Sequence, residues 1–179
     1  MAYIKDFRWK KGMKVRDLLE NYRSLGYQSI ELKKASDVFV KMKKDNAKIF
    51  LTFTSNMVTS GLRGFFSQVI SLGMADIIVT TVGGIEEDIM KAYGERFRIG
   101  NFDTDDVDLH EKGVNRIGNI LVNNESYMRF EDRMRPLFDR LYEKKKRWAV
   151  SELLREIGLV LDDGSSFLFQ AAKKDVPIF

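Results

Sequence analysis

The sequence predicts an α/β fold in which helices cover a mainly parallel sheet, and two apolar segments carry this prediction. Residues 48–53 and 77–82 are short runs rich in Ile, Val, Phe and Leu, which is typical of strands buried on both faces. Between them, residues 57–73 have the pattern of a helix. A strand, a helix and a second strand in this order form a βαβ unit, so the two strands are expected to run in the same direction.

The other elements follow from apolar periodicity and from capping residues. Residues 1–12 lack periodicity and are expected to form an arm anchored by Phe7 and Trp9. Residues 95–116 are expected to be a long charged connection, and residues 117–122 and 175–179 have the apolar character of short strands. Helices are expected over residues 14–25, 29–45, 85–94, 124–147, 151–158 and 165–174, with Asn124, Ser151 and Ser165 or Ser166 as caps.

Composition bounds the class of protein. A chain of 179 residues with 44% hydrophobic content fits one domain over residues 1–179. It contains no segment of the length and apolarity of a membrane span or a signal peptide, so we expect a cytoplasmic protein. The absence of cysteine excludes disulfides and a cysteine nucleophile, and the single histidine, His110, excludes a two-histidine metal site in this chain. The Asp-rich residues 103–106 lack the spacing of a calcium loop, and no metal is expected.

The net charge of +4 is unevenly distributed. Residues 1–48 contain 13 Lys and Arg against 6 Asp and Glu, which leaves nucleic-acid binding open as an interpretation. The lysines alternate with apolar residues at helical spacing, however, so we favour an ordinary amphipathic helix and expect no nucleic acid. Residues 83–131 have 11 acidic against 6 basic side chains, which favours a positively charged ligand nearby.

Polar residues follow both predicted strands and indicate a ligand site. Ser55 and Asn56 follow the first strand, and Gly83 and Gly84 follow the second. The carboxyl ends of parallel strands meet at one edge of a sheet, so both turns are expected to line one crevice. Glycines there would let the backbone approach a bound group, whereas Thr54, Ser55 and Asn56 could instead serve only as helix caps. No G-x-G-x-x-G motif is present.

An acidic cluster follows the glycine pair, in the expected first turn of the next helix: Glu86, Glu87 and Asp88. Two interpretations stay open. The acids could stabilise the start of the helix through its dipole, or they could bind a cationic substrate beside a dinucleotide.

Four segments together resemble the deoxyhypusine synthase family: residues 53–61 (FTSNMVTSG), 79–88 (VTTVGGIEED), 113–119 (GVNRIGN) and 174–179 (KDVPIF). Their order and spacing match over nearly the whole chain. The resemblance implies a Rossmann-like three-layer αβα sandwich, incomplete in this chain, and a tetramer with sites at dimer interfaces. It also implies an NAD-dependent transferase that moves the aminobutyl group of spermidine to a lysine of the translation initiation factor that carries hypusine. An enzyme lysine captures the intermediate imine in this family.

The resemblance assigns roles to residues of the two turns. It implies that NAD is bound by Ser55, Asn56, Met57, Val58, Thr59, Thr81, Val82, Gly83 and Glu87. It implies that spermidine is bound by the acidic pair Glu86 and Glu87, whose carboxylates suit an ammonium group.

The chain departs from the family pattern at its end. The catalytic lysine of the family, with its spermidine-site histidine and tryptophan, would lie after residues 177–179, so no catalytic residue is expected in this chain. Two explanations stay open: the enzyme is divided into two polypeptides with this one as its amino-terminal half, or this chain is a fragment of a longer product. In both cases we expect no activity from this chain alone, and we favour an obligate complex with a complementary carboxyl-terminal polypeptide. A non-catalytic subunit that binds NAD or polyamine, and a homospermidine synthase-like transferase, remain alternatives.

Overall fold

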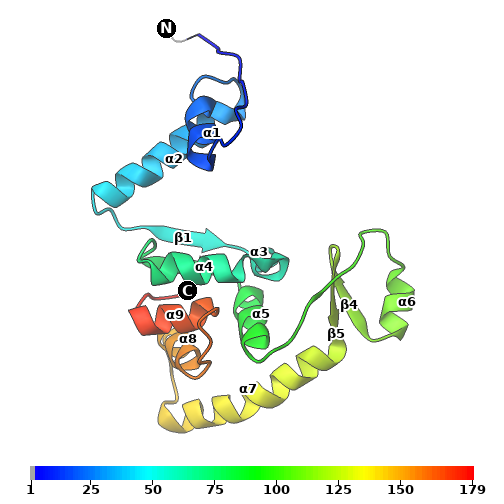
Figure 1. Ribbon diagram of the computed structural model, residues 1–179. Coiled ribbons are helices and arrows are strands. Elements are labelled where there is room, and N and C mark those ends of the chain that lie inside the picture. Colours follow the sequence, from blue (N-terminus) through cyan, green and yellow to red (C-terminus); the bar gives the residue numbers. More distant parts are fainter. Residues whose placement is uncertain (1–2) are drawn as a thin grey trace. The chain divides into compact units, whose positions relative to one another are not determined.

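The computed structural model describes residues 3–179 (Figure 1), and contacts divide the chain into one unit up to Lys48 and a second unit, Ile49–Phe179. The first unit contains helices α1 (Val15–Tyr22) and α2 (Gln28–Lys44). The backbone N–H of Lys5 donates to the Ser24 carbonyl at 3.0 Å, which ties the arm to the end of α1. Phe7 and Trp9 are exposed, so their predicted anchoring role is wrong. The single-domain assignment stays a prediction.

The second unit is built on a parallel sheet, as the sequence predicts. Strand β1 (Phe50–Phe53) pairs in parallel with β2 (Ile77–Thr80), so that Phe53 lies opposite Thr80. The last residues add to the other side of β2 through a parallel bridge between Ile78 and Ile178, and the Phe179 N–H donates to the Ile78 carbonyl at 3.0 Å. The predicted strand at residues 175–179 is therefore confirmed at its final residues.

The connection from β1 to β2 is not the single helix predicted for residues 57–73. It consists of α3 (Ser55–Met57), a π-helical turn η1 (Val58–Leu62) and α4 (Arg63–Ser71). Gly61 has φ of +105°, a conformation that side chains with a Cβ rarely adopt, and it interrupts the helix there. The sequence pattern does not predict this break, because apolar residues continue at helical spacing through it.

Aromatic side chains join the sheet to two helices. Phe53 of β1 stacks on Phe66 of α4 with ring centroids 3.8 Å apart, and it meets Phe167 of α9 (Phe167–Lys174) edge to face at 5.3 Å. Figure 1 shows α4 alongside β1, and α9 packs against α4. Together with α8 (Val150–Leu159), these helices contribute buried side chains to the hydrophobic core.

A second, antiparallel sheet spans residues 98–123, which include most of the predicted charged connection and the short strand predicted at residues 117–122. Its strands are β3 (Arg98–Ile99), β4 (Val114–Ile117) and β5 (Ile120–Asn123), in the order β3-β5-β4, and helix α6 (Asp106–Glu111) precedes β4. Gly118, with φ of +64°, forms the turn between β4 and β5. The prediction of one long connection over residues 95–116 is therefore wrong, and the strand predicted at residues 117–122 is in fact the end of β4, a turn and most of β5.

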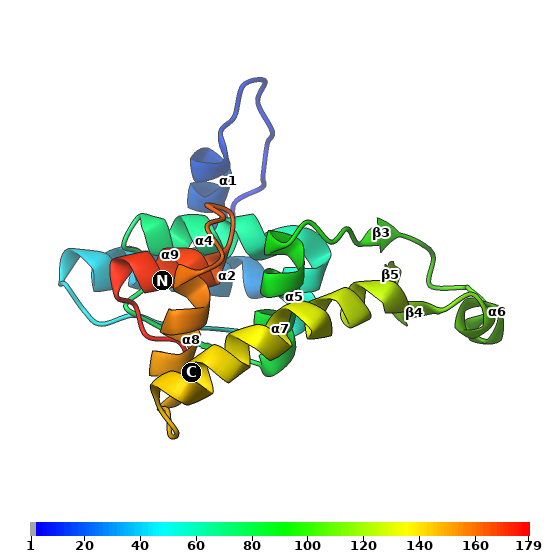
Figure 2. The same cartoon turned by 90° about the horizontal axis from the view of Figure 1, so that it is seen from below.

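Two helices follow the strands and complete the second unit. Helix α5 (Val82–Ala92) follows β2, and the long α7 (Asn124–Lys144) runs from β5 past α5, as Figure 2 shows. Asn124 and Ser151 lie inside their helices, so they are not the predicted caps, whereas the Ser166 hydroxyl caps α9 by accepting from the Phe169 N–H at 3.0 Å. Among residues 3–179, no helix combines the length and apolarity that crossing a bilayer requires.

Candidate functional site

The two polar bends lie against each other at the carboxyl edge of the parallel sheet. The Ser55 N–H donates to the Thr81 hydroxyl at 3.1 Å, and the Thr80 hydroxyl donates to the Phe53 carbonyl at 2.8 Å. This arrangement follows from the parallel register, because Phe53 and Thr80 are paired and the chain turns into a helix directly after each. We refer to residues 55–59 as the first bend and residues 81–87 as the second bend.

Glycines at the start of α5 allow this close approach. A Cβ on Gly84 would lie 2.9 Å from the Thr80 hydroxyl oxygen, and a Cβ on Gly83 would lie 3.1 Å from the Ser55 Cβ. Both distances are shorter than an ordinary van der Waals contact. The two glycines lie inside the first turn of α5, and they face the first bend, so their demonstrated role is to pack the second bend against the first.

The acidic residues lie one turn later in the helix than the sequence predicts. Helix α5 begins at Val82, so Glu86, Glu87 and Asp88 lie in its second turn, and none of them lies in the first. The dipole interpretation therefore loses its basis, because the effect fades beyond the first turn.

Asp88 has a structural role that the sequence does not reveal. Its fully buried carboxylate accepts from Arg63 of α4, from the Ser166 hydroxyl at 2.7 Å and from the Leu168 N–H at 2.9 Å. Arg63 also donates to Asp163 at 2.6 Å. Asp88 therefore joins α4, α5 and α9.

Glu87 is the buried carboxylate at the junction of the two bends. Its side chain is buried, and its oxygens lie 2.7 and 2.5 Å from the Thr59 hydroxyl. Burial raises the pKa of Glu87, a rise that the Thr59 hydrogen bond and the Lys91 charge oppose and the Glu86 charge adds to. Burial likewise raises the pKa of Glu86. A cation bound nearby would therefore stabilise the ionised forms of both carboxyl groups.

Two further residues of this site escaped sequence analysis. The Lys91 ammonium donates to the carbonyls of Val58 and Thr59 at 2.7 and 3.3 Å and lies 4.6 Å from the centre of the Phe97 ring. Burial lowers the pKa of Lys91. Lys91 lies four positions after Glu87, on the same helix face, a spacing that could have identified it.

Tyr127 of α7 is the second residue. Burial raises its pKa first, and the charges of Glu86 and Glu87 raise it further, which places its phenol within electrostatic reach of the acidic pair. No sequence signal distinguishes it, because Tyr127 belongs to the regular apolar face of α7.

Some of the predicted cofactor residues are exposed and others are buried. Asn56, Met57, Thr81 and Val82 are exposed, whereas Val58 is fully buried in the core cluster. In the described chain, neither Thr54 nor Thr81 caps its helix with a side-chain hydrogen bond. The first N–H to bond within α5 belongs to Gly84, so the preceding N–H groups suit the phosphates of a dinucleotide.

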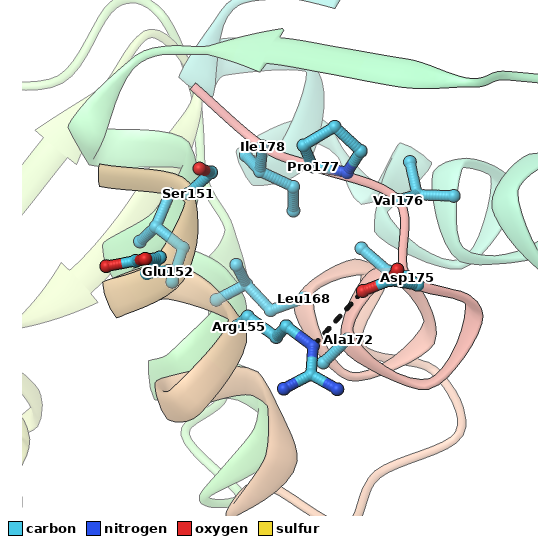
Figure 3. A pocket seen from close by; sticks show the side chains of 11 residues that line it. Ser151, Glu152, Arg155, Leu168, Ala172, Asp175, Val176, Pro177 and Ile178 are labelled. Atoms are coloured by element: carbon cyan, nitrogen blue, oxygen red, sulfur yellow. Dashed lines mark ion pairs between the residues drawn. The ribbon is translucent and has the colours of Figure 1, made fainter. Parts of the chain in front are cut away.

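Two hollows lie in the second unit. One of about 460 Å³ opens beside Thr59 and Lys91 and extends to Phe97 and Asn119. A separate pocket of about 290 Å³ lies between α8, α9 and the final residues, with Leu168, Ala172 and Ile178 on its apolar wall and an Arg155–Asp175 ion pair of 3.3 Å at its rim (Figure 3). The predicted site residues do not line this second pocket. Among residues 3–179, no group of three potential metal-binding side chains occurs.

Fold and site together define an α/β protein with two adjoining bends and a buried carboxylate at the carboxyl edge of a parallel sheet. The profile of the deoxyhypusine synthase family matches residues 17–179. The chain belongs to the deoxyhypusine synthase family, as the sequence motifs predict.

Individual relatives agree with this assignment. The chain is 36% identical over 183 residues to a probable deoxyhypusine synthase of Schizosaccharomyces pombe, covering 94% of this chain and 52% of that protein. It is 34% identical over 206 residues to the deoxyhypusine synthase of Senecio vernalis, covering 99% and 55%. The crystal structure of a candidate deoxyhypusine synthase from Entamoeba histolytica superposes with a TM-score of 0.67 at 26% identity, covering 98% and 61%. The chain thus spans about half the length of the curated relatives it matches.

Proposed function

We propose that this chain is the amino-terminal part of an NAD-dependent deoxyhypusine synthase, which transfers the aminobutyl group of spermidine to a lysine of the hypusine-carrying translation initiation factor. Family membership supports the transferase class. The observation that carries the finer proposal is the buried Glu87 carboxylate, which lies where the two bends meet.

In this proposal the acidic pair binds the amine. Glu86 and Glu87 have raised pKa values because burial disfavours their charge, so an ammonium group beside them would offset that cost. Tyr127 of α7 lies within electrostatic reach of the acidic pair, and Lys91 holds the backbone of the first bend. These residues bind and orient a polyamine, whereas none of them is assigned as the nucleophile.

The proposed cofactor site comprises both bends: Ser55, Asn56, Met57, Val58, Thr59, Thr81, Val82, Gly83 and Glu87. Bound NAD would supply a hydride acceptor for amine oxidation. The uncapped start of α5 offers N–H groups for its phosphates. Buried Val58 shapes the floor of the bend, and the exposed Asn56, Met57 and Val82 are the side chains that can touch the cofactor directly.

The proposal includes a partner. Relatives are about twice as long as this chain, and the family resemblance assigns the nucleophilic lysine to the portion that this chain does not contain. We propose that a complementary carboxyl-terminal polypeptide supplies that lysine, within a tetrameric, cytoplasmic assembly. Native mass spectrometry tests this point, since a second polypeptide is expected in the complex, and a lone, well-folded monomer that binds nothing would contradict it.

Transfer assays separate the proposed function from its alternatives. Labelled spermidine is expected to modify the translation factor in the presence of NAD and the native complex. Transfer to putrescine instead would indicate a homospermidine synthase-like enzyme. Turnover that does not depend on Glu86 or Glu87 would favour a non-catalytic subunit.

A further inference from the structure

Thr59 occupies a position where one hydroxyl hydrogen faces two acceptors. Its oxygen lies 2.7 and 2.5 Å from the Glu87 carboxyl oxygens and 3.1 Å from the Ser55 carbonyl oxygen. A hydroxyl has a single hydrogen to donate, so Thr59 can donate to only one of these partners at a time. Which partner receives the hydrogen depends on whether Glu87 itself carries a proton.

The two protonation states of Glu87 give two complete arrangements. When Glu87 is neutral, its O–H donates to the Thr59 oxygen, and the Thr59 O–H is free to donate to the Ser55 carbonyl. When Glu87 is ionised it can only accept, so the Thr59 O–H turns to the carboxylate and Ser55 loses this donor. Charge-assisted hydrogen bonds are the stronger kind, which favours this second arrangement as soon as the proton leaves.

We propose that the Thr59 hydroxyl is a two-position hydrogen-bond switch that couples the protonation state of Glu87 to the carbonyl of Ser55 in the neighbouring bend. Thr59 is then a positioning residue. One end of the switch lies in the acidic pair and the other in the first bend. This inference rests on the proposed function only where it links the switch to ligands, because the hydrogen-bond geometry itself requires no ligand.

The surroundings limit the movement to the hydroxyl. The Lys91 ammonium donates to the carbonyls of Val58 and Thr59, which holds the backbone of the bend in place. Thr59 is itself buried, so water is a poor substitute for either acceptor. When the charge of Glu87 changes, rotation of the Thr59 hydroxyl about its Cβ–Oγ bond is therefore the adjustment that costs the least free energy.

Several charged or titratable groups act on Glu87 besides Thr59. Glu86 and Lys91 lie on the same helix, and Tyr127 faces the acidic pair from α7. Arg63 of α4 is already paired with Asp88 and Asp163. Burial favours neutral Glu87, and a bound ammonium would favour the ionised form. Amine binding would then release a proton to solvent and turn the Thr59 hydroxyl away from Ser55.

The test follows the Ser55 carbonyl directly by NMR in the full chain. Ser55-Asn56 is the single Ser-Asn pair in the sequence, so labelling serine carbonyls with ¹³C and asparagine nitrogens with ¹⁵N isolates one peptide signal. We expect its carbonyl shift to change with pH at the same midpoint as the Glu87 carboxyl signal, which Glu87→Gln assigns. Thr59→Val should abolish the change at Ser55 while Glu87 still titrates, and Thr59→Ser should retain it.

Ser60→Ala is the matched control, because the Ser60 hydroxyl also donates to a backbone carbonyl, that of Met57 at 3.0 Å, but touches no carboxylate. It should leave the Ser55 profile unchanged. A Ser55 signal that ignores pH while Glu87 titrates in the unmodified chain overturns the switch, and so does a profile that persists in Thr59→Val.

Spermidine provides a separate arm of the experiment. Added to the native complex below the Glu87 midpoint, it should move the Ser55 signal towards its high-pH position. If pH moves the signal but spermidine does not, the switch stands and the amine-site proposal fails. If spermidine binds while the Ser55 signal ignores pH, the switch fails and the proposed function stands.

Discussion

Asp88 should be essential to the fold of the second unit, and Asp88→Asn tests this. The substitution keeps the size of the side chain and an oxygen that can accept from Ser166 and Leu168, but it places an NH₂ group against Arg63. Removing one partner of a buried ion pair costs about 3–5 kcal/mol. Because Arg63 keeps its contact with Asp163, we expect the free energy of unfolding to fall by about 3 kcal/mol, the lower end of this range.

Urea unfolding of the full chain, followed by circular dichroism, measures this loss. With a typical slope of about 2 kcal/mol per M, the midpoint should fall by about 1.5 M. Asp163→Asn is the matched control, since it removes the more exposed partner of the same arginine, and its loss should be about 1 kcal/mol or less. Equal losses in the two variants would refute the assignment of Asp88 as the residue that joins α4, α5 and α9.

Three further predictions concern other parts of the second unit. Gly84→Ala should destabilise the chain by about 1–3 kcal/mol in urea unfolding, because its Cβ would clash, whereas Gly64→Ala, with open space around it, should not. Polyamine binding, measured by calorimetry, should strengthen as pH rises through the raised pKa of Glu87 and should release a proton only below that pKa, and affinity independent of pH would contradict this. The bidentate Arg129 pair lowers the pKa of Glu95 to about 2, so its stabilising effect should fade as pH falls from about 4.5 towards 2, and Arg129→Gln should abolish that pH dependence.

Local patterns were sufficient to predict the part of the fold that supports the site. The apolar runs at β1 and β2 have the composition of strands buried on both faces, and parallel strands necessarily present their carboxyl ends at one edge. That edge brings Ser55 and Thr81 together. The serine cap of α9 was also predictable, because capping depends on residues only three positions apart.

Contacts between distant residues could not be predicted in this way. Asp88 looks like a third member of the acidic cluster, and only the folded chain places Ser166, 78 positions away, against its carboxylate. Residues 117–122 were predicted to form one short strand, whereas Gly118 turns the chain there, so that β4 ends at Ile117 and β5 begins at Ile120. The break at Gly61 likewise leaves no trace in the apolar spacing.

The central claim is that the two bends form one site for a polyamine beside a dinucleotide, with Glu87 at its centre. Equilibrium dialysis of labelled spermidine against the native complex, in the presence of NAD, tests it most directly. Glu87→Gln should weaken binding at least tenfold, about 1.4 kcal/mol, whereas Glu111→Gln on the exposed surface of α6 should leave it unchanged. Equal affinity in the two variants would contradict the account.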